Sequence, residues 1–292
     1  MTILIDGKLV AKTVRNNVKE KVAAIQEQYN KQPSLAVVLV GNNPASEIYV
    51  NNKVKACEKT NIKSIVIRMD ESSTQEQVEN KIKELANDKD INGILVQLPL
   101  PRGFDQDKII SLIPKLKDVD GLTKENAASL LMNQSATVPC TPKGIVDLLK
   151  YYDIEIEGKR AVIIGRSMLV GKPLFNLLTN LNATVTLCHS KTKAIEEITK
   201  EADIVVCALG NPFFLKKDMI KEGAVVIDVG INRLDDGRVV GDTDFDNLLD
   251  KASYITPVPG GCGPMTVAEL LDNTIECFIK QNEWWIRTIS TT

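Results

Sequence analysis

The chain has 292 residues, of which 43% are hydrophobic and 25% are charged, and its formal net charge is −2. This is the composition of a globular protein, and the length exceeds the usual size of one hydrophobic core, so we expect two domains. The near-neutral balance without clustered Lys and Arg argues against nucleic acid as a partner, and no apolar run is long enough to cross a bilayer. The first residues lack the pattern of a signal peptide, so we expect a cytoplasmic protein with no membrane partner.

Cysteine and histidine usage argues against a metal centre. Six cysteines are scattered without a CxxC pair, which fits neither a disulfide framework nor a structural zinc site. His189 is the single histidine, so a His-rich metal cluster is excluded and we expect no metal. We interpret His189 as a strand-end packing residue or a cofactor neighbour. Proton transfer then falls to Lys, Tyr or a carboxylate.

In the first half of the chain, short apolar runs alternate with longer amphipathic ones. The pattern predicts strands at 33–41, 63–70 and 91–101, and helices at 43–57 and 74–88. Thr74 and Gln77 have the spacing of a capping box, which supports the start of the second helix. Strands that alternate with helices indicate parallel βαβ units.

The second half repeats this alternation. Strands are predicted at 160–165, 183–188, 202–208, 223–230 and 253–259. Two further helices are expected, one with Thr141 as N-cap and Pro142 at its first position, and one over 265–282. We therefore predict an α/β protein of two domains with a cleft between them: an N-terminal catalytic domain (1–140 plus 265–292) and a Rossmann-like nucleotide-binding domain (141–264).

One helix carries a pair of residues that need an explanation. Val50, Val54 and Cys57 recur at the interval of one helical face and should be buried. Tyr49 and Lys53 are four residues apart and so are neighbours beside that face. Taken alone, such a pair usually lies on the solvent-exposed surface and has no function in binding or catalysis.

A nucleotide signal follows the strand at 160–165. Gly165 and Gly171 bracket a turn, and Pro173 opens a helix, although Ser167 stands where the GxGxxG fingerprint has its second glycine. A strand, a glycine-bounded turn and a helix N-terminus present backbone N–H groups to a phosphate. An ordinary βα turn explains the short motif equally well.

The end of the next predicted strand distinguishes the two nicotinamide cofactors. An NAD site places Asp or Glu there, but this chain has Ser190, Lys191 and Lys193. Together with Arg166, these hydroxyl and cationic donors favour the 2′-phosphate of NADP over NAD. The alternative is a solvated loop.

Eight segments, taken together and in order, resemble the bifunctional methylenetetrahydrofolate dehydrogenase/methenyltetrahydrofolate cyclohydrolase family. They span residues 43 to 266 and read NPASEIYVNNKVKAC, GILVQLPLP, KDVDG, PCTPKG, VIIGRSMLVGKP, ATVTLCHSKT, VIDVGIN and TPVPGGCGPMT. One departure follows KDVDG, where Leu122, Thr123 and Lys124 replace the Phe-His-Pro of many members. We expect the loop around Asp120 to differ in shape there.

The resemblance implies a role for the unexplained pair. Tyr49 would lie against the aromatic ring system of a tetrahydrofolate derivative, and Lys53 would be the central catalytic group. Gln97 would hydrogen-bond Lys53, and Asp120 would bind the pterin. The alternative is that Asp120 has only a structural role in an Asx turn. The other implied substrate-binding residues are Leu98, Pro259, Gly260, Gly263 and Pro264.

The resemblance also implies the cofactor residues and the assembly. Arg166, Ser167 and Ser190 would meet the phosphates of NADP. The remaining implied cofactor residues are Cys140, Thr141, Gly165, Gly171 and, near the nicotinamide, Ile231. The resemblance also implies that two copies of this chain form a homodimer through their nucleotide-binding domains.

The implied reaction is oxidation of 5,10-methylenetetrahydrofolate with NADP and hydrolysis of the methenyl product to 10-formyltetrahydrofolate. Removing hydride from a carbon between two nitrogens leaves a cation, whose hydrolysis needs a base such as an uncharged lysine amine. Two alternatives stay open at this point. One is a shikimate-dehydrogenase-like NADP oxidoreductase, and the other is a nucleotide-binding regulator without catalytic activity.

Overall fold

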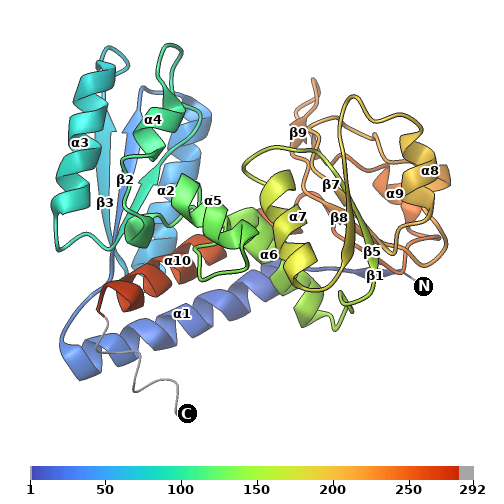
Figure 1. Ribbon diagram of the computed structural model, residues 1–292, viewed down its shortest axis with the longest axis horizontal. Helices are drawn as coiled ribbons and strands as arrows, with labels where there is room; N and C mark the ends of the chain where they lie inside the picture. The colour runs from blue at the N-terminus through green and yellow to red at the C-terminus, as the bar shows by residue number, and fades with distance from the viewer. Residues whose placement is uncertain (1, 283–292) are drawn as a thin grey trace. The chain divides into compact units, whose positions relative to one another are not determined.

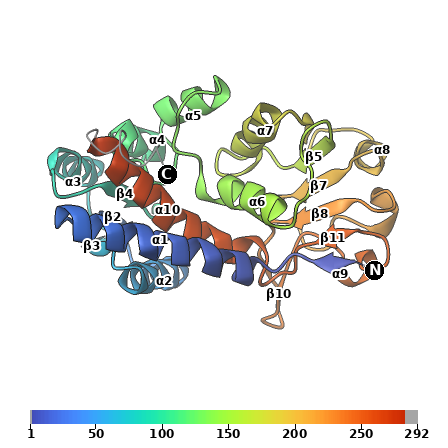
Figure 2. The same ribbon diagram turned by 90° about the horizontal axis from the view of Figure 1, so that it is seen from below.

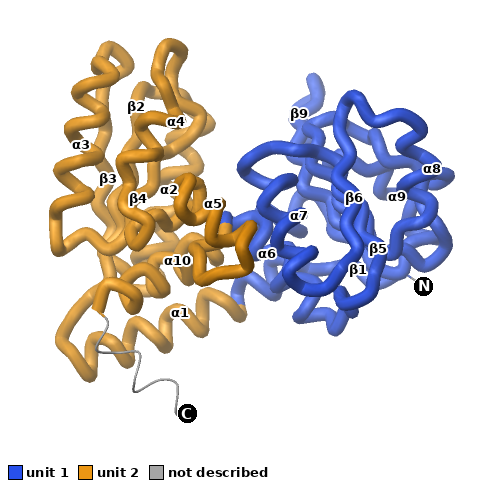
Figure 3. The backbone as a smooth tube through the Cα atoms, in the orientation of Figure 1, with its two compact units in different colours: residues 1–12, 139–266 blue, residues 13–138, 267–292 orange. Residues whose placement is uncertain are grey.

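The computed structural model describes residues 2–282. The chain forms two compact units, coloured separately in Figure 3. Unit 1 contains residues 1–12 and 139–266, and unit 2 contains residues 13–138 and 267–292. Two of the boundaries fall inside helices, α1 (Gly7–Tyr29) and α10 (Cys262–Gln281).

Unit 2 is built on a three-stranded parallel sheet in the order β3-β2-β4 (Figure 1). Its central strand β2 (Ser34–Val40) has a strand on each side and is buried along its whole length. The flanking strands are β3 (Lys63–Met69) and β4 (Gly93–Val96). A continuous apolar run of this kind is typical of a strand buried on both faces.

Helices cover this sheet. The core includes Val38 of β2, Ile94 of β4 and the inward face of α3, which contributes Val78 and Ile82. In Figures 1 and 2, α1 and α10 lie side by side, and an ion pair of 2.8 Å joins Lys21 to Asp272. The other helices of unit 2 are α2 (Pro44–Lys59), α3 (Gln75–Asn87), α4 (Gln106–Ile110), η1 (Lys115–Lys117) and α5 (Lys124–Leu131).

The local sequence explains where these helices begin and end. The side chain of Asn43 caps α2 by accepting from two backbone N–H groups. At its other end Asn61 adopts the left-handed conformation with φ 59°, which Asn tolerates better than most residues. The capping box predicted for Thr74 and Gln77 is confirmed at the start of α3.

Unit 1 is a parallel six-stranded sheet in the order β1-β11-β8-β7-β5-β6. The chain leaves β5 for β6 on one side and then returns to β7 on the other, which creates a topological switch point at the carboxyl end of β5. The strands are β1 (Ile3–Leu4), β5 (Arg160–Ile164), β6 (Thr184–Cys188), β7 (Ile204–Cys207), β8 (Val225–Asp228) and β11 (Tyr254–Ile255). The remaining elements are α6 (Cys140–Tyr151), α7 (Gly171–Asn180), α8 (Ile195–Lys200), η2 (Lys217–Met219), α9 (Phe245–Leu248) and the hairpin of β9 (Asn232–Arg233) with β10 (Val239–Val240).

The compact units differ from the expected domains at the N-terminus. We expected residues 1–12 to belong with the first domain, but β1 pairs in parallel with β11 of unit 1. Gly7 also packs so closely on the 257–261 loop that an added Cβ would lie 1.8 Å from the carbonyl oxygen of Gly261. These contacts are long-range, and local sequence pattern does not encode them.

Two predicted helix starts were wrong by a few residues. Helix α6 begins at Cys140 with Pro139 as its N-cap, so Thr141 lies inside the helix. Helix α7 begins at Gly171, two residues before Pro173. Proline is tolerated anywhere in the first turn, where backbone N–H groups have no intrahelical partner, so its position does not define the start.

Candidate functional site

A lysine and an amide meet at the carboxyl end of the sheet in unit 2. Lys53 Nζ on α2 donates a hydrogen bond of 2.9 Å to Gln97 Oε1, the contact that the resemblance implied. Gln97 directly follows β4 and is buried, and its backbone N–H donates to Val38 of β2 at 2.8 Å. Its Nε2 donates to the carbonyl oxygen of Leu98 at 2.7 Å. The backbone bond fixes the position of Gln97, and the Nε2 bond orients its side-chain amide so that Oε1 faces Lys53.

Tyr49 lies one turn before Lys53 on the same helix. Its side chain is 47% exposed, whereas Val50 and Cys57 are buried and Val54 is half-buried. The α2 face therefore packs into unit 2 much as expected, with the Tyr49–Lys53 pair at its border. A large aromatic side chain at that exposure offers a ring surface to a ligand.

Asp120 is placed next to the same strand end. Asp118 forms an isolated parallel bridge with Ile94 of β4, and Asp120 follows it by two residues. Ile94, Val96, Asp118 and Asp120 line one small recess. The structure thus brings the Asp120 segment to the strand end that carries Gln97.

The departure from the family pattern after KDVDG has a structural explanation. Thr123 is the N-cap of α5, and its hydroxyl accepts from the Asn126 N–H at 3.3 Å. The Asp118 carboxylate accepts from the Thr123 N–H at 2.8 Å. The three changed residues therefore turn the chain into α5 with the capping chemistry of a helix start.

In unit 1, two glycines form the turn at the topological switch point. Gly165 has φ 127°, and a Cβ there would lie 2.2 Å from the carbonyl oxygen of Ala208. A Cβ on Gly171 would lie 1.9 Å from the carbonyl oxygen of Gly165. Only glycine fits either position, and the close approach brings the N-terminus of α7 against the end of β5.

The side chains around this turn suit a phosphorylated nucleotide. Arg166, Ser167 and Ser190 are exposed beyond the carboxyl ends of β5 and β6, which are adjacent strands. The Ser167 hydroxyl also accepts from the Val170 N–H at 3.1 Å. His189 belongs to the turn after β6, where its Nδ1 accepts from the Lys191 N–H at 3.1 Å. Cationic and hydroxyl donors without a carboxylate at this strand end fit the 2′-phosphate of NADP.

A second group of expected residues lines a pocket of about 190 Å³ within unit 1. Its wall includes Ile231, which is 56% exposed, and four residues that the resemblance assigned to the substrate. Those four are Pro259, Gly260, Gly263 and Pro264. Lys8 also lines this pocket. The sequence analysis missed Lys8 because it lies far from the loop in the chain and has no motif of its own.

Cys140 and Thr141 lie at the start of α6. Cys140 is buried, and the hydroxyls of Thr141 and Thr266 share a hydrogen bond of 3.1 Å. This contact ties α6 to the 262–266 segment within unit 1.

Sequence reasoning also missed two buried carboxylates that hold the loops of unit 1. Asp242 accepts hydrogen bonds from the backbone N–H groups of residues 209–211 and from Asn232 Nδ2, all at 2.7–3.0 Å. Asp228 accepts from the N–H groups of Gly230 and Asp242, both at 2.9 Å. Burial raises the pKa of the Asp228 carboxyl. The GDTD stretch gave no signal because the partners come from three separate loops.

The fold and these groups define a class of protein, a two-unit α/β enzyme with a Rossmann-like nucleotide-binding half. Residues 5–120 match the family described as tetrahydrofolate dehydrogenase/cyclohydrolase, catalytic domain, and residues 139–282 match its NAD(P)-binding domain. The chain belongs to this tetrahydrofolate dehydrogenase/cyclohydrolase family.

Individual relatives cover nearly the whole chain. The bifunctional protein FolD of Campylobacter concisus is 53% identical over 93% of this chain and 96% of its own length. The crystal structure of FolD from Campylobacter jejuni is 47% identical, with a TM-score of 0.93 over 95% of this chain and 98% of that one. FolD of Trypanosoma brucei, solved with NADP and an inhibitor, is 38% identical, with a TM-score of 0.91 over 96% of this chain and 98% of that one.

Two features are absent from residues 2–282. None of the helices described there is long and apolar enough to cross a membrane. The same residues contain no group of three or more His, Cys, Asp or Glu side chains placed to hold a metal ion.

Proposed function

We propose that this protein oxidises 5,10-methylenetetrahydrofolate with NADP and hydrolyses the resulting 5,10-methenyl compound to 10-formyltetrahydrofolate. The observation that carries the proposal is the Lys53–Gln97 hydrogen bond of 2.9 Å, in a chain that is 53% identical to a bifunctional FolD over most of its length. NADP, when bound, supplies the acceptor for the hydride. The protein's own residues bind, orient and handle protons.

Lys53 acts at the one-carbon unit. In hydrolysis of the methenyl cation, a water adds to the carbon and loses a proton. One carbon–nitrogen bond then breaks as the new hydroxyl gives up its proton to form the formyl C=O and the leaving nitrogen gains a proton, so that one proton is released overall. The amine of Lys53 takes the proton from that water. Gln97 holds the amine in place through an uncharged acceptor, so it orients Lys53 without fixing a positive charge there.

The pterin is held by complementary groups. The Asp120 carboxylate accepts from its N–H donors, and the Tyr49 ring packs on its aromatic face. The backbone around Leu98 contributes to the same site. Pro259, Gly260, Gly263 and Pro264 shape the substrate wall.

Arg166, Ser167 and Ser190 bind the phosphates of NADP, and Gly165 and Gly171 allow the backbone to approach them. Cys140 and Thr141 lie beside the cofactor, and Ile231 packs near the nicotinamide. We further propose a cytoplasmic homodimer that joins through the nucleotide-binding unit, without nucleic acid or membrane as a partner.

The alternatives are not favoured. A shikimate-dehydrogenase-like oxidoreductase shares the two-domain plan, but the relatives at about half identity are bifunctional FolD proteins. A regulator without catalytic activity has no need for the intact Lys53–Gln97 pair.

The test is Lys53→Met in an absorbance assay that follows NADPH formation from methylenetetrahydrofolate and, separately, disappearance of methenyltetrahydrofolate. We expect hydrolysis to fall to the uncatalysed rate, while NADP binding stays within about twofold, a negligible change in free energy. Lys55→Met is the matched control, because Lys55 is an exposed lysine on the same helix. Full hydrolysis by Lys53→Met would remove Lys53 from its assigned role, and absence of both activities in the wild type would overturn the function.

A further inference from the structure

We propose that Asn273 of α10 is a positioning residue for Asp120 and thereby sets the affinity for the folate substrate. The proposal rests on the proposed function, in which Asp120 binds the pterin. Asn273 is fully buried, and neither the sequence motifs nor the resemblance assigns it a role.

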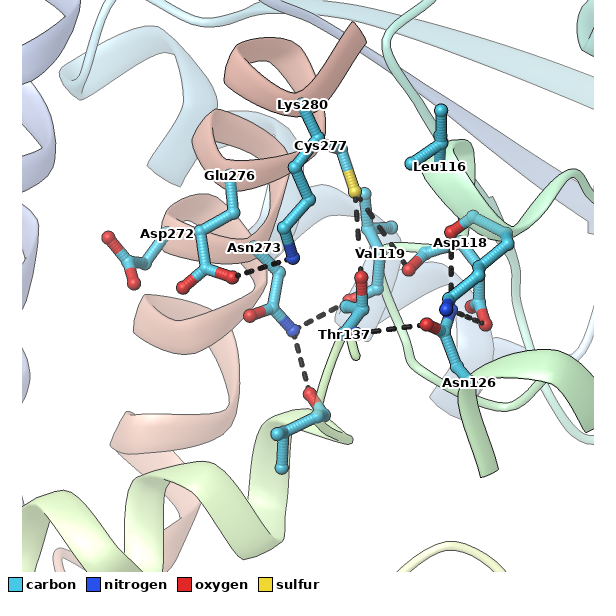
Figure 4. Close-up of polar contacts among 12 residues, drawn as sticks. Leu116, Asp118, Val119, Asn126, Thr137, Asp272, Asn273, Glu276, Cys277 and Lys280 are labelled. Carbon is cyan, nitrogen blue, oxygen red and sulfur yellow. Dashed lines mark hydrogen bonds and ion pairs between the residues drawn. The ribbon is translucent and has the colours of Figure 1, made fainter. Parts of the chain in front are cut away.

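The segment before Asp120 is held first by its own carboxylate. Asp118 accepts from the N–H groups of Leu122 at 3.3 Å and Thr123 at 2.8 Å. It also accepts from Asn126 Nδ2 at 2.9 Å (Figure 4). These bonds close the turn that contains Asp120. They act from the α5 side of the turn.

Asn273 holds the same turn from α10. Its Nδ2 donates to the carbonyl oxygens of Val119 and Val138, both at 2.9 Å (Figure 4). The Val119 carbonyl belongs to the peptide bond that leads into Asp120. Both amide hydrogens of Asn273 are therefore used to join residues 119 and 138, and one of them fixes the backbone directly before the proposed pterin ligand.

Two further contacts brace this connection. Cys277 lies one turn after Asn273, and its Sγ is 3.9 Å from the Asp118 carbonyl oxygen and 3.9 Å from Thr137 Oγ1. The N–H of Thr137 in turn donates to Asn126 Oδ1 at 2.9 Å. Helix α10, the Asp118 turn and α5 thus share one buried polar network, which is costly to leave partly satisfied.

Packing blocks the opposite direction of movement. Val119 lies against Gly93 of β4 so closely that an added Cβ at Gly93 would be 2.5 Å from Val119 Cγ1. The turn cannot shift toward β4 without a clash. Without Asn273 the freedom gained is therefore on the α10 side, and Asp120 would move with it.

The position of Asn273 in the sequence and its position in the structure predict different kinetic effects. Residue 273 falls in the stretch matched to the NAD(P)-binding domain, 139–282, but the structure places it in unit 2 with Asp120. A residue of the nucleotide domain would alter the KM for NADP. A positioning residue for Asp120 alters the KM for the folate.

The experiment measures dehydrogenase kinetics of wild type, Asn273→Ala and the control Asn282→Ala. Asn282 directly follows α10, and its Nδ2 donates to the Phe278 carbonyl of α10 and not to the turn that contains Asp120. We expect Asn273→Ala to raise the KM for methylenetetrahydrofolate about tenfold, the size of one or two lost hydrogen bonds to buried carbonyls. The KM for NADP should change by less than about twofold, and Asn282→Ala should leave both constants unchanged.

A purely structural role would lower thermal stability and the active fraction without separating the two KM values, because KM does not depend on the amount of folded enzyme. Asn273→Ser keeps one hydroxyl donor and should give a smaller rise in the folate KM; it replaces Asn273→Ala if that variant does not fold. An unchanged folate KM in an active variant overturns the inference alone. An inactive wild type overturns the proposed function instead.

Discussion

Gln97 shows how one residue can be oriented by its own neighbours. Its backbone N–H is bound to Val38 and its Nε2 to the Leu98 carbonyl, so Oε1 is the group left to face Lys53. An amide suits this place because a carboxylate would form an ion pair with the lysine and favour its charged form. In the proposed function, the reaction therefore depends on a neutral partner as much as on the lysine.

The cysteines illustrate the opposite case, in which burial removes reactivity. All six are buried, and burial raises the pKa of the Cys57 and Cys277 thiols to about 12. Burial also raises the pKa of Cys188, Cys207 and Cys262. Each of these groups stays a neutral thiol over the range in which a free cysteine ionises.

We predict that the native protein reacts negligibly with a disulfide reagent such as Ellman's at about pH 8, near the usual thiol pKa of about 8.5. Because the pKa values are raised, reactivity should stay low as the pH increases past that value. All six thiols should react after denaturation. Rapid modification of a thiol in the folded protein would contradict the prediction.

At the scale of elements, the turns that follow β5 and β6 in unit 1 differ in what they contribute. The turn between β5 and α7 is shaped by glycines that approach carbonyl oxygens too closely for any side chain. In the proposed function, the turn after β6 supplies the side chains that distinguish NADP from NAD. Asp228 and Asp242 then hold the loops after β7 and β8 by accepting backbone N–H groups. Rigid loops of this kind reduce the entropy lost when a cofactor binds.

Ser190→Asp should shift the cofactor preference from NADP towards NAD. A carboxylate at the end of β6 repels the 2′-phosphate and accepts from ribose hydroxyls, so we expect the KM for NADP to rise by at least about tenfold, or roughly 1.4 kcal/mol. Initial rates with each cofactor measure the shift. Ser190→Ala separates the loss of the hydroxyl from the added charge, and an unchanged preference in Ser190→Asp would place the 2′-phosphate elsewhere.

At the scale of the whole molecule, each unit is assembled from distant parts of the chain. Unit 1 takes its edge strand β1 from the N-terminus, and unit 2 takes part of α10 from near the other end. Neither unit is a continuous stretch of sequence. In the proposed function, Lys53, Gln97 and Asp120 lie in unit 2, and the cofactor residues Arg166, Ser167 and Ser190 lie in unit 1. That division follows the structural units and not a simple split at the middle of the chain.

Hydrogen exchange should report the two ligands in different units. NADP alone should slow exchange at 165–171 and 189–193, because a ligand that binds the native state suppresses local opening at its site. A non-reactive folate analogue alone should slow exchange at 49–57 and 118–122. Protection by NADP confined to 49–57 would be incompatible with the assignment.

The predictable parts share local causes. The alternation of strands and helices and the Thr74 capping box both depend on residues close in sequence. The expected Lys53–Gln97 contact came from the family resemblance and not from spacing, since 44 residues separate the two. The start predicted for α6 was wrong because proline fits several positions in the first turn of a helix.

The amino-acid sequence by itself determined the α/β class, most strands and helices, and the family, because these depend on periodicity and on motifs within short stretches. Only the tertiary structure decided that β1 joins the sheet of unit 1, that Asp228 and Asp242 hold the cofactor-side loops, and that Asn273 is bonded to the residue before Asp120. The physical reason is that each of these contacts joins groups far apart in the chain. Their energy comes from burial and hydrogen-bond satisfaction in the folded state, and no local pattern records it.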